Sequence, residues 1–131
     1  MKRVFSFLIL AIIFAGACKN SGKKIETVIP AQMDFKETTF NFGAIPNGSE
    51  QKCSFEFQNT SKVPLVISTV IESCGCTISK WPKKPIRPGK SGIIEIKYKP
   101  AGAGLFRKSI SVFSNAKNSP VHLYIKGEII L

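Results

Sequence analysis

Residues 51–59 read Gln-Lys-Cys-Ser-Phe-Glu-Phe-Gln-Asn, and this stretch decides the fold class. Cys53, Phe55 and Phe57 share one parity, while the residues between them are polar. Successive side chains of a β-strand point to opposite faces of the sheet, so this alternation predicts a strand with one buried face. A strand with one buried and one solvated face is typical of an antiparallel sheet.

Similar strand signals recur on both sides of this stretch, separated by turns rich in Gly, Pro and Asn. Residues 63–72 are β-branched and apolar on both parities, which predicts a strand covered on both sides or crossing an edge, with residues 73–77 continuing it. Prolines at 82, 85 and 88 exclude a central strand at 81–89. No segment has a helical period. We therefore predict an all-β, immunoglobulin-like antiparallel β-sandwich of about seven strands over residues 38–131.

The N-terminal segment has the organisation of an export signal. Met1–Arg3 is positively charged, residues 4–14 are almost entirely apolar, and the small residues 15–17 precede Cys18. The apolar run is too short to cross a bilayer core of about 30 Å as a helix. We predict that residues 1–17 form a signal peptide.

Residues 15–18, Ala-Gly-Ala-Cys, resemble a bacterial lipobox, which predicts cleavage before Cys18 and attachment of lipid to it. The alternative is an ordinary signal peptide that ends near a cysteine. Residues 18–37 are polar and lysine-rich, and we interpret them as a lipidated cysteine followed by a flexible tether. The protein is then expected to be exported and lipid-anchored in the bacterial cell envelope, at the outer membrane.

The formal net charge is +11 at pH 7. Removal of residues 1–17 takes away two basic residues and no acidic ones, which leaves +9. An exported protein does not meet the genome, so we expect no nucleic-acid partner. Anionic lipid headgroups, an anionic glycan or an acidic envelope protein are the expected contacts, and a merely solvated basic surface is the alternative.

Ser73-Cys74-Gly75-Cys76-Thr77 carries the least ordinary chemistry of the chain. Residues two apart in a strand are separated by about 6.5 Å, whereas a disulfide needs Cβ atoms roughly 3.5–4.5 Å apart. A Cys74–Cys76 bond therefore requires the chain to bend at Gly75. The alternative is a bond from Cys53 to one of the two, because Cys53 is expected to face the core.

Four roles for Cys53, Cys74 and Cys76 remain open from the sequence: structural stabilisation, metal binding, thiol–disulfide exchange and linkage to a partner. Thiolates suit Cu(I), or Zn²⁺ with a further ligand. His122 has the parity opposite to its apolar neighbours, so it is expected at the surface rather than in a metal site. We predict no resident cofactor.

The segment from Lys80 to Lys90 combines basic residues, three prolines and the chain's single tryptophan. It is a candidate surface for an acidic or glycan partner. The alternative is a loop that packs over one end of the sandwich, with Trp81 filling the core. The candidate contact residues are Lys80, Trp81, Lys83, Lys84 and Arg87.

Conventional catalysis has little support, because the sequence places no nucleophile beside a base. We predict a non-enzymatic binding or assembly module of the cell envelope. The alternative is an envelope protein that handles copper, zinc or thiols through Cys74 and Cys76.

Several short motifs together resemble a known bacterial family, catalogued as DUF1573. They include Phe42-Gly43-Ala44-Ile45, Asn59-Thr60, Ser73–Thr77 and Pro88-Gly89. The family is similar to immunoglobulin-like modules of the major sperm protein and ASPM, SPD-2, Hydin class. The resemblance covers residues 38–131 and implies a β-sandwich, export in Gram-negative bacteria, frequently a lipoprotein signal, and no established enzymatic activity. The family pattern has no cysteine at the position of Cys53, so the resemblance does not settle the pairing of the thiols.

Overall fold

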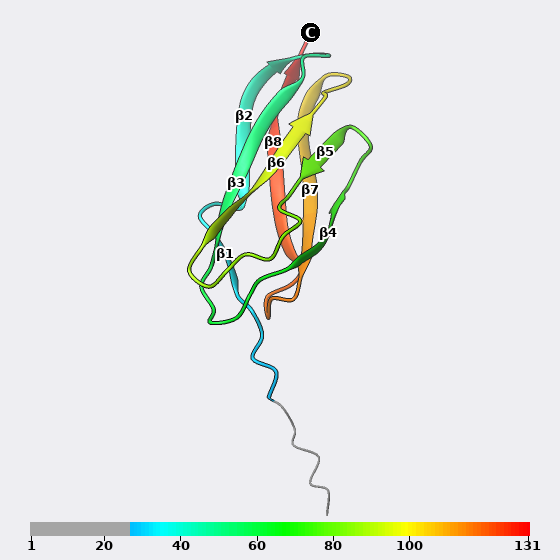
Figure 1. Ribbon diagram of the computed structural model, residues 1–131. Coiled ribbons are helices and arrows are strands. Elements are labelled where there is room, and N and C mark those ends of the chain that lie inside the picture. The colour runs from blue at the N-terminus through cyan, green and yellow to red at the C-terminus, as the bar shows by residue number, and fades with distance from the viewer. Residues whose placement is uncertain (1–26) are drawn as a thin grey trace, which may run out of the picture.

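The computed structural model of the protein describes residues 27–131, which form an elongated all-β domain (Figure 1). Within these residues there are eight strands and no helix long and apolar enough to cross a bilayer. The strands are β1 (Met33–Phe35), β2 (Thr39–Pro46), β3 (Gln51–Asn59), β4 (Ile67–Glu72), β5 (Thr77–Lys80), β6 (Ser91–Tyr98), β7 (Gly104–Ser114) and β8 (Val121–Ile130).

The strands form two four-stranded sheets, one in the order β1-β3-β6-β5 and the other in the order β2-β8-β7-β4. All pairings are antiparallel except that β2 runs parallel to β8. Residues 36–38 carry the chain from β1 in one sheet to β2 in the other. The predicted immunoglobulin-like sandwich is confirmed, with one parallel pairing.

The core lies between the sheets and follows the predicted alternation. Phe55 and Phe57 of β3 are 2% and 0% exposed, and Ile94 and Ile96 of β6 lie beside them in the same sheet. The second sheet contributes buried aliphatic side chains from β4, β7 and β8, namely Ile67, Val70, Ile110, Val112, Leu123, Ile125 and Ile129. Alternate residues of β3, β6, β7 and β8 therefore form the inner faces, whereas in β4 a register shift between Ile67 and Thr69 places Ile67 and Val70 in the core together.

The domain begins earlier in the chain than predicted. Ala31 and Met33 are each 1% exposed, and β1 pairs with the end of β3. The interpretation of residues 18–37 as a tether is thus wrong for residues 31–35, because their sparse apolar side chains enter the core. The predicted signal peptide at 1–17 and lipidation site at Cys18 lie outside the described residues.

The strand predicted at 63–77 is also shorter than expected. β4 covers Ile67–Glu72, and residues 63–66 contribute a single bridge, between Leu65 and Ile86. Residues 73–76 form a turn, and a new strand, β5, starts in the opposite sheet at Thr77. The proline-rich segment 81–90 contains no strand, as predicted.

The chain enters the sandwich at one end, which we call the entry end: residues 27–32 and the loops 60–66, 81–90 and 115–120 (Figure 1). Hydrogen bonds tie these four segments together. The Lys117 amide donates to the Ala31 carbonyl (2.8 Å), and the Thr60 amide donates to the Gln32 carbonyl (3.3 Å).

Asn59, which is 0% exposed, links two of the entry-end loops through its side chain. Its Nδ2 donates to the carbonyls of Val63 (2.8 Å) and Ile86 (2.9 Å), and its Oδ1 accepts from the amide and the hydroxyl of Ser61. A buried amide with both ends satisfied holds the loops in one arrangement. The asparagine of the Asn59-Thr60 motif is therefore structural.

Candidate functional site

Cys74 and Cys76 are joined by a disulfide, with their Cα atoms 5.4 Å apart. The bond forms because the chain leaves the extended conformation here, in the turn at residues 73–76. Gly75 lies at the bend. A Cβ added to it would meet nothing within 4 Å. The structure thus resolves the predicted alternatives: the two cysteines pair with each other, and Cys53 is free.

The disulfide turn connects the two sheets. β4 is the edge strand of one sheet and β5 the edge strand of the other, so the turn crosses the open side of the sandwich. Its start is fixed by the Ser73 amide, which donates to the Ser109 carbonyl of β7 (2.9 Å). Its end is fixed by the Lys99 amide, which donates to the Cys76 carbonyl (3.0 Å). The Thr77 hydroxyl donates to the Cys74 sulfur (3.6 Å), which carries no proton of its own.

Cys53 is partly buried on the inner side of β3, opposite Ile96 of β6 and packed against the core cluster. Burial raises the pKa of its thiol to about 11. Because the thiolate is the reactive and metal-binding form, this thiol is a poor nucleophile and a poor ligand at neutral pH. Cys53 behaves as a small apolar core residue.

The disulfide also bears on the metal hypothesis. In the bonded state Cys74 and Cys76 present no thiolate, and thiolates are the form that binds Cu(I) and Zn²⁺. Among residues 27–131, no three His, Cys, Asp or Glu side chains are arranged to hold a metal ion. His122 is exposed, as predicted, and its Nδ1 lies 3.0 Å from the Ser111 hydroxyl.

Trp81 packs against the core cluster directly after β5 and is partly buried. The Lys83 ammonium lies over its ring, 2.9 Å from the ring centroid. A cation over an indole face is attracted by the ring quadrupole, a contact that contributes about 0.5–1 kcal/mol at exposed sites. Both contacts favour the interpretation in which Trp81 closes the core beneath the loop.

The predicted contact residues do not form one patch. Lys80 projects from the outer face of β5, because its neighbour Ser79 points inward. Lys84 and Arg87 lie in the exposed loop of the entry end instead. Trp81 and Lys83 lie between these two groups in the chain and contact each other.

Three shallow hollows follow one another along the outer face of β5 and β6, which we call the β5–β6 face. The first, of about 460 Å³, is lined by Trp81, Ile93 and Glu95 among others. A second, of about 530 Å³, shares Lys80 and Glu95 with it. The third, of about 440 Å³, shares Ile78 and Lys97 with the second and reaches Cys76.

Two residues of the β5–β6 face were missed by sequence reasoning. Ile78 is 61% exposed and Ile93 is 49% exposed, so both present apolar surface to solvent. The signal was present, since Ile93 has the same parity as Glu95 and Lys97 and lies on their polar face. An isoleucine at an outward position of an otherwise charged strand was the clue.

Solved structures with the same architecture have little sequence similarity to this chain. A protein of unknown function from Porphyromonas gingivalis aligns with a TM-score of 0.68 at 18% identity, covering 80% of this chain and 51% of that one. This chain thus spans about half of that protein. The ASH/PapD-like domain 7 of human CEP192 aligns with a TM-score of 0.65 at 9% identity, covering 77% and 87%. WR4, an MSP family member from C. elegans, gives 0.50 at 10% identity, covering 76% and 99%.

At such identities these similarities establish the fold alone. They agree with the predicted relation to major sperm protein and ASH modules. No functionally curated protein has a detectably similar sequence. The family model described as "Protein of unknown function (DUF1573)" matches residues 33–129, which is nearly the whole described domain. The chain belongs to the DUF1573 family.

Proposed function

We propose that the protein is a non-enzymatic binding or assembly module of the bacterial cell envelope, anchored by lipid at Cys18, that engages its partner through the β5–β6 face. The sandwich acts as a rigid support in this proposal. Immunoglobulin-like sandwiches commonly bind through strand edges and sheet faces, so function is assigned to the surface rather than to the fold.

The observation that carries the proposal is the pair of exposed isoleucines, Ile78 and Ile93, in adjoining hollows. Lys97 lies opposite Ile78, and the Lys80 and Glu95 pair lies between Ile78 and Ile93, so apolar and charged side chains alternate along this face. Protein interfaces combine apolar side chains with charged residues that stay accessible to solvent, and both kinds are present on this face.

Strand β5 adds a second means of recognition. It pairs only with β6, so its other edge presents backbone amides and carbonyls that no strand of its own sheet satisfies. An extended peptide can add to such an edge, with backbone hydrogen bonds supplying affinity and side-chain hollows supplying specificity. We therefore infer a protein partner that presents an extended, partly apolar segment.

Site-specific photo-crosslinking in the bacterium that encodes the protein tests this surface. A photoreactive amino acid is placed at Ile78 or Ile93, and in matched controls at the exposed His122 or Lys126 of β8 in the other sheet. We expect the same adduct from positions 78 and 93 and none from 122 and 126. Equal adducts at all four positions, or none at 78 and 93, would overturn the assignment.

The anchor is tested separately by labelling with radioactive palmitate. Wild-type protein is expected to incorporate label and to sediment with membranes, whereas Cys18→Ala is expected to lose both properties. Cys53→Ala serves as the control, because Cys53 lies against the core and should not affect labelling. Label that survives Cys18→Ala would contradict lipidation at this residue.

Thiol–disulfide exchange is the second candidate function, and the Cys74–Cys76 bond favours it over metal binding. In such a reaction a thiolate of a partner dithiol attacks one sulfur of the disulfide, and the other cysteine leaves as a thiolate. The second partner thiol then resolves the mixed disulfide. The partner is oxidised by two electrons while Cys74 and Cys76 become a dithiol.

Treatment of the folded protein with dithiothreitol, followed by alkylation and mass spectrometry, tests this candidate. Exchange predicts that Cys74 and Cys76 become labelled while the domain stays folded. Labelling only after unfolding in urea would exclude the reaction for the native protein.

A further inference from the structure

The charges of the described domain are distributed unequally between its two ends. The entry end carries six exposed basic residues and no Asp or Glu in its four segments. The opposite end, formed by loops 46–51, 73–76 and 99–104, carries one acidic and one basic residue, Glu50 and Lys99. The entry-end cations are Lys62, Lys83, Lys84, Arg87, Lys90 and Lys117.

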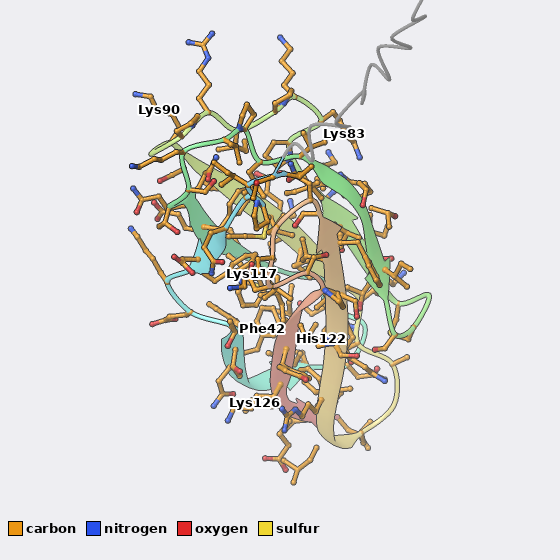
Figure 2. All side chains as sticks on the ribbon, turned by 90° about the horizontal axis from the view of Figure 1, so that it is seen from below. Phe42, Lys83, Lys90, Lys117, His122 and Lys126 are labelled. Carbon is orange, nitrogen blue, oxygen red and sulfur yellow. A yellow bond between two sulfur atoms is a disulfide. The ribbon has the colours of Figure 1, made fainter. Side chains whose placement is uncertain are left out.

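The segments that carry these cations are joined in space, although Lys62 and Lys117 are 55 positions apart in the sequence. Asn59 ties loop 60–66 to loop 81–90, and Asn115 ties loop 60–66 to loop 115–120 through the Val66 amide (2.8 Å). Figure 2 shows the molecule from below, with the Lys90 side chain directed away from the ribbon and Lys126 of β8 far from it. The six cations therefore belong to one end of the molecule.

Few groups of the domain neutralise this end. Within residues 27–131, the two salt bridges join Lys36 to Glu56 and Lys52 to Glu50, and neither includes an entry-end cation. Among residues 27–131, the nearest acid along the chain is Asp34 of β1, whose carboxylate accepts hydrogen bonds from Thr60 and Gln32. Those hydrogen bonds lower its pKa, so the carboxylate stays ionised, but it is already paired with Thr60 and Gln32 rather than with a cation.

Apolar side chains accompany the charge. Val28 and Ile29, in the segment that enters the sandwich, are 84% and 61% exposed. Basic residues beside exposed aliphatic ones are the combination with which proteins bind the surface of an anionic bilayer, because charge attracts the headgroups and apolar groups enter the boundary beneath them.

We propose that the entry end docks directly on anionic phospholipid headgroups. This rests on the proposed anchor, because a lipid at Cys18 tethers the chain on the side of residue 27 and turns this end toward the bilayer. The domain then stands on the membrane, and the disulfide turn at its other end points away from it. The lipid attached at Cys18 and the six cations then both bind the same membrane, which gives firmer attachment than either alone.

Vesicle co-sedimentation of residues 27–131 tests this proposal. The fragment is suitable because it contains all eight strands and every buried residue of the described chain. Vesicles of phosphatidylcholine with phosphatidylglycerol are compared with vesicles of phosphatidylcholine alone. We expect binding only to the anionic vesicles. Binding should be lost in about 1 M salt, because charges separated by more than roughly 3 Å are then largely screened from one another.

Matched variants locate the surface. Each basic residue near an anionic bilayer strengthens binding about fivefold, so Lys84→Gln/Arg87→Gln should weaken binding about 25-fold. Lys99→Gln/Lys126→Gln removes the same net charge away from the entry end and should leave binding nearly unchanged. Circular dichroism confirms that both variants fold.

Equal loss in both variants, or no binding to anionic vesicles, would overturn the proposal. Stronger retention on an immobilised anionic polysaccharide than on the vesicles would assign the surface to glycan instead. Because the fragment lacks Cys18, a failure here leaves the palmitate test of the anchor unaffected. A failure of palmitate labelling equally leaves the vesicle result standing.

Discussion

Asn59→Ala is expected to lower the free energy of unfolding by about 2–4 kcal/mol. The wild-type side chain makes four hydrogen bonds at a fully buried position, and each contributes roughly 1 kcal/mol, which sets the upper value. The lower value follows because two acceptors keep a partner. Once Asn59 is removed, the Ser61 hydroxyl proton is free to be donated to the Val63 carbonyl (3.0 Å), and the Ile86 carbonyl still accepts from the Leu65 amide (2.9 Å).

Asn115→Ala is the matched control. Asn115 also joins two loops of the entry end, accepting from the Val66 amide (2.8 Å) and donating to the Pro64 carbonyl (3.0 Å). Asn115 is exposed, so water replaces the lost partners. We expect a loss below about 1 kcal/mol for this variant.

Urea denaturation followed by tryptophan fluorescence measures both variants, because the chain has a single tryptophan, at position 81. The midpoint should fall for Asn59→Ala with an unchanged slope, which indicates a change in stability rather than in the surface exposed on unfolding. The assigned role of Asn59 would be refuted if both variants lost the same stability.

Asn59→Asp adds a test that depends on pH. The new carboxylate would face two carbonyl oxygens without water, so burial and those oxygens raise its pKa in the folded state above about 3.9. A group with a raised pKa in the folded state favours folding in its protonated form. The stability deficit relative to wild type should therefore be smallest below pH 4 and grow as the pH rises through the folded-state pKa.

Three further predictions concern the core and the cysteines. Gly92→Ala should lower the free energy of unfolding by about 1–3 kcal/mol, because the added Cβ would meet the buried Phe57 ring, including Cε1 at 3.0 Å and Cε2 at 3.1 Å. Gly75→Ala is the control, because a Cβ at that position has open space, and equal melting temperatures for the two variants would contradict the packing argument. Iodoacetamide should label Cys53 about 100-fold more slowly at pH 8 in the folded protein than in urea, because raising the thiol pKa from 9.0 to about 11 lowers the thiolate fraction by that factor. Equal labelling rates in the folded and the unfolded protein would place the thiol in solvent. Cys74→Ser/Cys76→Ser should lower the free energy of unfolding by no more than about 1.6 kcal/mol, because the bond closes a loop of only three residues. A much larger loss of stability, measured by calorimetry, would show that the turn organises both sheets.

Much of the candidate site was predictable from residue type and spacing. The requirement for a bend at Gly75 follows from strand geometry, and that bend is what brings Cys74 and Cys76 together. Their pairing was not predictable, because Cys53 is expected to face the core and a bond from it to one of the two was an open alternative. The choice depended on the distance between β3 and the turn, which is a property of the assembled sandwich.

The domain boundary and the grouping of charge show the same limit. Residues 31–35 have too few apolar residues in an alternating pattern to predict a strand. β1 forms because it pairs with the free edge of β3. Lys62 and Lys117 are far apart in sequence, and their loops are brought together by Asn59 and Asn115, whose partners lie in other segments.

The sequence by itself determined the all-β class, the buried face of β3 and the family, because these depend on local alternation and local turns. Only the tertiary structure decided the parallel pairing of β2 with β8, the Cys74–Cys76 bond, the exposure of Ile78 and the basic entry end. The physical reason is that each of these depends on which strand edges and loops meet in space. Such contacts are fixed by packing between residues distant in the chain, which local periodicity does not encode.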